Sequence, residues 1–100
     1  MPLEDMKPLA DDMAELMKTL AHANRLLALC AIMDNERSVG KLAEDLGMRT
    51  QAMSQQLAIL RNKGLVKTRR DGQTIYYSLA DDRLHRLIST LYDTYCRPAA

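Results

Sequence analysis

A change of apolar repeat near residue 64 is the feature that most constrains the fold of this chain. Before it, apolar residues recur at helical spacing, whereas residues 65–68 and 74–79 alternate as β-strands do. These two runs flank Asp71-Gly72, a dipeptide typical of tight hairpins because glycine adopts the positive φ that the turn needs. The sequence therefore predicts a mainly helical fold with one small β-hairpin.

Five helical segments surround this hairpin. They are expected at residues 9–20, 23–33, 39–46 and 50–62, and in a last segment that Asp81 or Asp82 caps and that carries apolar residues to Tyr95. Residues 23–33 are apolar almost all round, which predicts a central, buried helix. Ser38 is expected to cap the third helix, and Gly47 suits a sharp turn after it.

Length and composition limit the class of protein. A chain of 100 residues with 47% hydrophobic and 27% charged residues is expected to form one domain over residues 1–100, with frayed tails at 1–7 and 98–100. The net charge is only +1, but acidic residues gather early and basic residues late, which indicates an anion-binding second half. No signal peptide or membrane-spanning run is present, so we expect a cytoplasmic protein with no membrane partner.

The two helices that meet at Gly47, followed directly by a basic hairpin, form the pattern of a winged helix-turn-helix. In the 50–62 helix, Met53, Leu57 and Leu60 face inward, which leaves short and amide side chains on the outer face. Such side chains read base edges, and a helix N-terminus offers free N–H groups to phosphate. For any single residue, a solvated polar surface is an equal alternative. The predicted DNA contacts are Arg49, Thr50, Gln51, Ser54, Gln55, Arg61, Arg69, Arg70 and Gln73.

The apolar residues of the first and last helices exceed what one small core needs. An exposed apolar stripe usually marks an interface, so the sequence predicts a homodimer through these two helices. The residues of this predicted interface are Leu9, Met13, Leu16, Leu84, Ile88, Leu91 and Tyr95.

Four stretches of the sequence carry a family resemblance: residues 20–27 (LAHANRLL), 38–47 (SVGKLAEDLG), 53–66 (MSQQLAILRNKGLV) and 69–79 (RRDGQTIYYSL). With these stretches the chain resembles the ArsR family of bacterial repressors over about residues 10–96. The resemblance implies a winged-helix homodimer that binds a palindromic operator in double-stranded DNA and releases it on sensing an inducer.

The cysteines indicate which branch of that family the chain resembles. The metal-binding Cys-Val-Cys of the arsenic and cadmium type is replaced by Ser38-Val39-Gly40, and no second His follows His85 as the zinc and nickel type requires. Cys30 and Cys96 instead resemble the dithiol branch, which includes the biofilm-growth-associated repressors. That resemblance implies release of DNA when an oxidant or a reactive sulfur species links the two cysteines. We expect no cofactor and no metal.

The order of reaction and the rival functions are open at this point. Cys30 lies in the apolar helix and is expected to be the less accessible thiol, so Cys96 is expected to react first. A metal-responsive repressor using Cys30, Cys96 and His85 or His22 is the main alternative, and a winged-helix module that binds protein is another. An enzyme is disfavoured because the sequence has no nucleophile–base pair and no glycine-rich phosphate loop.

Overall fold

A computed structural model describes residues 1–97 and has the predicted winged helix-turn-helix architecture. The elements are, in chain order, α1 (Leu3–Met6), the 3₁₀ turn η1 (Lys7–Leu9), α2 (Ala10–Leu20), α3 (Ala23–Ala31), β1 (Arg37–Ser38), α4 (Val39–Leu46), α5 (Thr50–Asn62), β2 (Val66–Asp71), β3 (Thr74–Leu79) and α6 (Asp82–Tyr95).

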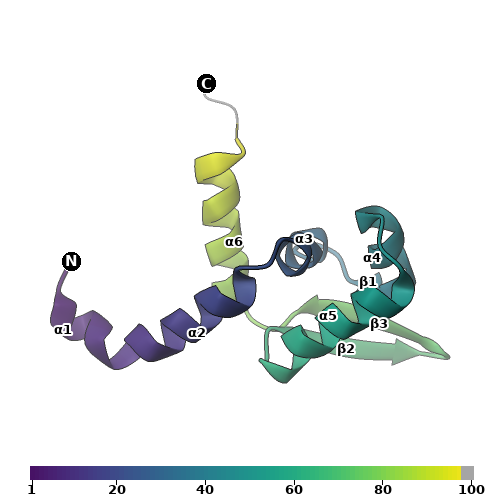
Figure 1. Cartoon of the computed structure of the whole chain (residues 1–100), viewed down its shortest axis with the longest axis horizontal. Helices are drawn as coiled ribbons and strands as arrows, with labels where there is room; N and C mark the ends of the chain where they lie inside the picture. Colours follow the sequence, from purple (N-terminus) through teal and green to yellow (C-terminus); the bar gives the residue numbers. More distant parts are fainter. Residues whose placement is uncertain (98–100) are drawn as a thin grey trace.

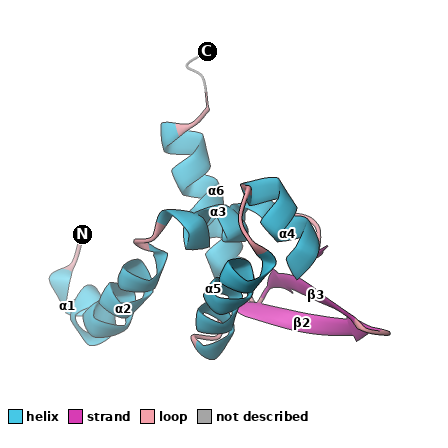
Figure 2. Cartoon of the chain, turned by 45° about the vertical axis from the view of Figure 1, so that its right-hand side comes forward, coloured by secondary structure: helices cyan, strands magenta, loops and turns pink. Residues whose placement is uncertain are grey.

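The elements form a compact body from which two helical arms project. Helices α3, α4 and α5 lie together over the β2–β3 hairpin, and the hairpin tip extends beyond them (Figure 1). The arm made of α1 and α2 leaves this body in one direction, and α6 leaves it in another (Figures 1 and 2). Helix α5 and the hairpin are therefore neighbours on one side, away from the free end of α6.

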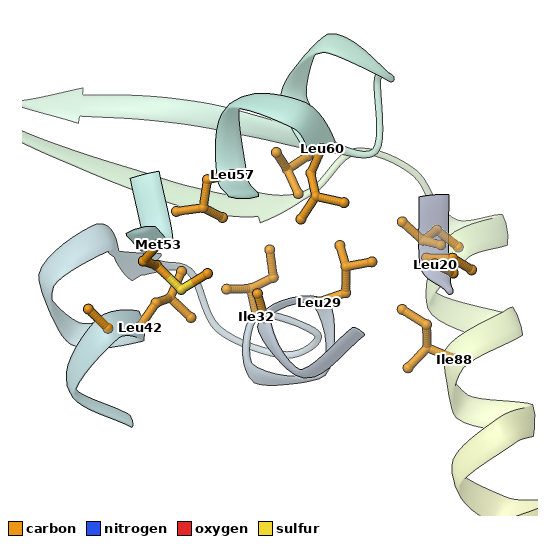
Figure 3. Packing of buried hydrophobic residues seen from close by; sticks show 12 residues of the cluster. Leu20, Leu29, Ile32, Leu42, Met53, Leu57, Leu60 and Ile88 are labelled. Carbon is orange, nitrogen blue, oxygen red and sulfur yellow. The ribbon is translucent and has the colours of Figure 1, made fainter. Parts of the chain in front are cut away.

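The core joins the helix-turn-helix to the bases of both arms. Leu29 and Ile32, at the end of α3, meet Leu57 and Leu60 from α5, and Ile88 from α6 closes the cluster on the other side (Figure 3). All five side chains are almost completely buried. Burial on this scale contributes about 1.5–3 kcal/mol for each large apolar side chain, so α5 is held rigidly in place by its inner face.

The caps and turns predicted from the sequence are confirmed where they position α4 and α6. The Ser38 hydroxyl accepts a hydrogen bond from the Lys41 backbone N–H at 3.2 Å, and Asp81, not Asp82, caps α6 by accepting from Leu84 N–H at 2.9 Å. Gly47 ends α4 with φ +65°, a left-handed conformation that glycine adopts without strain.

The hairpin differs from its prediction in length and in its turn. Strand β2 runs to Asp71, which pairs with Thr74, so Gly72 and Gln73 form a two-residue turn and Gly72 has φ +63°. Arg69 and Arg70 therefore lie in a strand and not in the loop. A third strand, β1, pairs with β3 to give the order β1-β3-β2. Two residues are too short to carry a detectable strand repeat, so the sequence did not predict β1.

Three other predictions need correction or fall outside the described residues. The segment 1–7, predicted to be frayed, carries α1 and the start of η1, while the predicted tail at 98–100 lies outside the described part of the chain. Helix α3 ends at Ala31 and is not buried all round, since Leu27 is 52% exposed and Cys30 is also exposed. None of the described helices is both long and apolar enough to span a membrane.

Candidate DNA interface and dithiol site

Helix α5 separates a core face from a polar face. Met53, Leu57 and Leu60 are fully buried, as their spacing predicts. The predicted reading residues Thr50, Gln51, Ser54 and Gln55 are all exposed, and the same helix positions them within its first two turns. The structure thus brings these four side chains together on one accessible surface, with no charged group among them.

The N-terminus of α5 is open to an anion. Arg49 stands at the N-cap position, and its side chain forms no capping hydrogen bond with the first turn. The first backbone N–H groups therefore point outward without a side-chain acceptor, which is the arrangement that binds phosphate at helix N-termini. Arg61 lies exposed in the last turn of the same helix, so the two arginines flank the polar face lengthwise.

The wing presents Arg70 and Arg69 on opposite faces. Successive strand residues point to opposite sides, and Arg70 shares its side with Val66, which is buried beneath the helices. Arg70 therefore extends the helix-facing side of the hairpin beyond the core. It forms no ion pair within the described residues. Gln73 is exposed in the turn itself.

Arg69 is occupied by contacts within the chain. Its Nε donates to both carboxylate oxygens of Glu36, at 3.0 and 3.1 Å, and its guanidinium lies 4.8 Å from the centre of the Tyr76 ring. The hydrogen bond from Arg69 lowers the pKa of the Glu36 carboxyl, so the contact is formed at neutral pH and is lost as the pH falls through that lowered pKa. Arg69 thus joins β2 to the residue that precedes β1.

A second arginine fixes α5 against the preceding helices. Arg25 donates through Nε to the carbonyl oxygen of Thr19 at 2.7 Å, and its Nη1 donates to Gln56 Oε1 at 3.4 Å. The contact ties the end of α2 and the start of α3 to the middle of α5. Sequence reasoning missed both Arg25 and Glu36 as positioning residues, because each acts through a partner about thirty residues away.

The two cysteines lie at the ends of two helices that meet in space. Cys30 is in the last turn of α3, Cys96 follows the last residue of α6, and both are free thiols exposed to solvent. Burial by its neighbours raises the pKa of the Cys30 thiol, and a negative charge on Cys96 raises that pKa further. Cys30 also lines one groove with Tyr92, Asp93 and Arg97, which are neighbours of Cys96 at the end of α6. Cys30 is exposed although it lies in the helix predicted to be buried, and because Cys96 is exposed as well, the expectation that Cys30 is the less accessible thiol stays a prediction.

A chain of polar contacts links α6 to the loop that follows α3. His85 Nε2 lies 3.2 Å from Asp34 Oδ1, and His85 Nδ1 lies 3.4 Å from the Ser89 hydroxyl. Across residues 1–97, no group of three or more His, Cys, Asp or Glu side chains is arranged to hold a metal ion. The alternative in which Cys30, Cys96 and His85 or His22 bind a metal therefore gains no support from the geometry.

The arms expose an apolar surface that one chain does not cover. Leu9, at the end of η1, and Met13 on α2 are 52% and 38% exposed, and Leu91 and Tyr95 on α6 are 36% and 81% exposed. Leu16 is half-buried. Two residues of the predicted interface, Leu84 and Ile88, are instead buried in the core of the chain itself. The helical repeat alone does not distinguish these two ends of α6.

Comparison with known proteins identifies the family to which this chain belongs. Residues 22–68 match the model of the bacterial regulatory protein family arsR. The biofilm growth-associated repressor of Agrobacterium fabrum is 45% identical over 97 residues, which cover 97% of this chain and 83% of the relative. The transcriptional activator HlyU of Vibrio cholerae is 39% identical, with 97% of this chain and 90% of the relative covered.

Solved structures agree with the sequence comparisons. The crystal structure of the transcriptional repressor BigR from Xylella fastidiosa superposes with a TM-score of 0.90 at 39% identity and covers 98% of this chain and 100% of that one. A homodimeric winged helix-turn-helix DNA-binding domain from Mycobacterium bovis gives a TM-score of 0.79 at 34% identity, covering 90% of this chain and 84% of that one. The named relatives are transcriptional regulators, which confirms the prediction against an enzyme. The chain belongs to the arsR family of winged helix-turn-helix transcriptional regulators.

Proposed function

We propose that this regulator is a homodimeric repressor that releases a palindromic operator when Cys30 and Cys96 become linked by an oxidant or a reactive sulfur species. The observation that carries the proposal is the position of two exposed thiols, 66 positions apart in the chain, at the ends of α3 and α6. The groove that Cys30 lines is also lined by Tyr92, Asp93 and Arg97 from the end of α6, next to Cys96.

The DNA-reading part of the proposal assigns separate tasks to the exposed polar residues. Thr50, Gln51, Ser54 and Gln55 contact base edges in the major groove, where an amide side chain pairs with adenine. Arg49, Arg61, Arg70 and Gln73 contact the phosphate backbone or the minor groove. We revise the assignment of Arg69, which positions the wing through Glu36 and contributes no phosphate contact of its own.

The dimer places two such surfaces on one DNA molecule. The exposed apolar residues of α2 and α6 pack against their counterparts in a second copy, through a two-fold axis. The dimer then presents its two α5 helices to half-sites related by the same two-fold axis, about one helical turn of DNA or a multiple of it apart. The homodimeric relative from Mycobacterium bovis, which has the same fold, supports this arrangement.

The switch acts through α6, which carries Cys96 at one end and contributes to the dimer surface. Burial raises the pKa of the Cys30 thiol, which makes Cys30 the less reactive nucleophile, so Cys96 reacts first and Cys30 completes the link. Linking the two cysteines fixes the free end of α6 to the end of α3. The angle of α6 against the body then changes, and with it the spacing of the two α5 helices across the dimer.

The test compares DNA binding and mass in three proteins. The wild type, Cys30→Ser and Cys96→Ser are treated with inorganic polysulfide or with a disulfide oxidant, and each is assayed for retardation of promoter DNA and by intact-mass spectrometry. We expect all three reduced proteins to bind DNA and only the wild type to release it, with a mass change located on Cys30 and Cys96. A Cys96→Ser protein that releases DNA as the wild type does would contradict the proposal.

A further inference from the structure

The segment that leads from α3 to the helix-turn-helix, residues 32–38, contacts several elements through separate side chains. Asp34 Oδ1 lies 3.2 Å from His85 Nε2 on α6, and Glu36 accepts hydrogen bonds from strand β2 of the wing. The side chain of Arg37 contacts both α3 and α4. A short stretch of chain therefore connects the end of α3 with the elements proposed to bind DNA.

Arg37 holds the end of α3. Its Nε donates a hydrogen bond at 2.7 Å to the carbonyl oxygen of Ala31, the last residue of that helix. Carbonyl groups in the last turn of a helix have no partner within the helix and form the negative end of its dipole, so a guanidinium is a favourable partner. Because Cys30 precedes Ala31, this contact fixes the backbone next to the thiol.

The same guanidinium reaches α4. Arg37 Nη1 lies 3.2 Å from Oδ2 of Asp45, in the last turn of α4, and the two side chains are only 33% and 30% exposed. The backbone of Arg37 is itself fixed, because it pairs with Tyr77 in β3. A guanidinium is planar and holds its donors in a rigid fork. One rigid group thus joins the end of α3 to α4.

We propose that Arg37 is a positioning residue for DNA binding, through which the end of α3 sets the placement of α4. Leu42 of α4 meets Met53 of α5 in the core, so a displacement of α4 changes the support of the polar face of α5 (Figure 3). A link between Cys30 and Cys96 then acts on the helix-turn-helix within one subunit, in addition to its effect on the dimer. The inference rests on the proposed thiol switch and assigns it an internal route.

The test measures the operator affinity of each protein before and after its thiols are linked with diamide, which takes two electrons and two protons from the thiol pair. Fluorescence anisotropy gives the affinities, and intact-mass spectrometry verifies the link. The readout is the ratio of the reduced affinity to the linked affinity. A variant that only weakens DNA binding lowers both affinities and leaves this ratio unchanged, whereas loss of the route lowers the ratio.

Two variants remove the tie, and a third is their matched control. Arg37→Gln removes both contacts of the guanidinium, and Asp45→Ala removes the contact with α4 alone. Asp45→Ala should remain folded, because alanine favours a helix and a negative charge near a helix C-terminus is unfavourable. Lys41→Gln removes the other ion pair of Asp45, at 3.2 Å, which lies within α4 and does not reach α3.

We expect Arg37→Gln and Asp45→Ala each to lower the ratio about fivefold, the scale on which substitutions along a coupled element change such a ratio. The double variant should lower it no further, because the two contacts act in series. Lys41→Gln should keep the wild-type ratio. A wild-type ratio in Arg37→Gln or Asp45→Ala would overturn the route through Arg37 alone. A wild-type protein that becomes linked without losing operator affinity would overturn the proposed switch, and this route with it.

Discussion

Replacing each of the two neighbouring wing arginines by alanine should give different results in a salt titration of DNA binding: Arg70→Ala should lower the salt dependence, and Arg69→Ala should not. Each phosphate contact adds about 0.9 to the slope of log affinity against log salt concentration. Arg70 forms no ion pair among the described residues, and the proposed dimer would present it twice. Arg70→Ala should therefore reduce the slope by about 1.8. Between roughly 50 and 200 mM salt, the wild type would then lose about twelvefold more affinity than this variant.

Arg69→Ala should leave that slope unchanged. Its guanidinium is held by the Glu36 carboxylate and lies over the Tyr76 ring, so it releases no counterion of its own when DNA binds. Affinity falls by the same factor at every salt concentration, because the wing loses its tie to the residue before β1. Glu36→Gln is the matched control, because it weakens the same tie while leaving the arginine charge in place.

Fluorescence anisotropy with a labelled operator duplex measures the slopes, and a non-specific duplex shows whether the effect depends on sequence. Arg70→Ala should weaken binding to both duplexes. A slope loss for Arg69→Ala equal to that of Arg70→Ala would refute the reasoning, because it would place Arg69 on a phosphate and make its contact with Glu36 irrelevant to the complex.

Four other outcomes are expected. Gln51→Ala and Gln55→Ala should each weaken operator binding by about 1–3 kcal/mol and have little effect on binding to non-specific DNA. Anisotropy with both duplexes measures this, and an unchanged preference for the operator over non-specific DNA would place the reading face elsewhere. Cys96→Ser should move the pH profile of Cys30 alkylation by iodoacetamide to lower pH, because removing the neighbouring negative charge lowers the pKa of Cys30. The protein should sediment as a dimer at micromolar concentration, and a monomeric mass would contradict the interface on α2 and α6. Leu57→Ala should lower the free energy of unfolding by about 2–5 kcal/mol in urea denaturation at fixed protein concentration, because its side chain is fully buried in the core.

The sequence predicted most accurately those elements whose determinants are local. The spacing of Met53, Leu57 and Leu60 located both faces of α5, because a helix that packs on a core repeats its apolar residues at a fixed interval. Ser38 and Gly47 marked the ends of α4 for similarly local reasons, a side-chain cap and a left-handed turn. These features need no knowledge of the rest of the chain.

Features that depend on distant partners were missed or misjudged. The apolar pattern of α3 suggested burial for Cys30, but the pattern records hydrophobicity and not which face this chain covers. Arg69 looked like a DNA contact because its partner Glu36 lies 33 residues earlier. Strand β1 exists only because β3 offers it a free edge. The pairing of α3 with α6, on which the thiol site depends, came only from the family resemblance.

The separation of faces along α5 has a consequence for how such regulators diversify. Because Gln51, Ser54 and Gln55 are exposed and Met53 and Leu57 carry the packing, substitutions at the three polar positions leave the core unchanged. Surface changes of that kind usually alter stability by less than about 0.5 kcal/mol. A duplicated gene can thus acquire a new binding site in the genome without first passing through an unstable protein. The same freedom makes these three positions suitable for a randomised library, in which altered target preference is selected while the packed core stays intact.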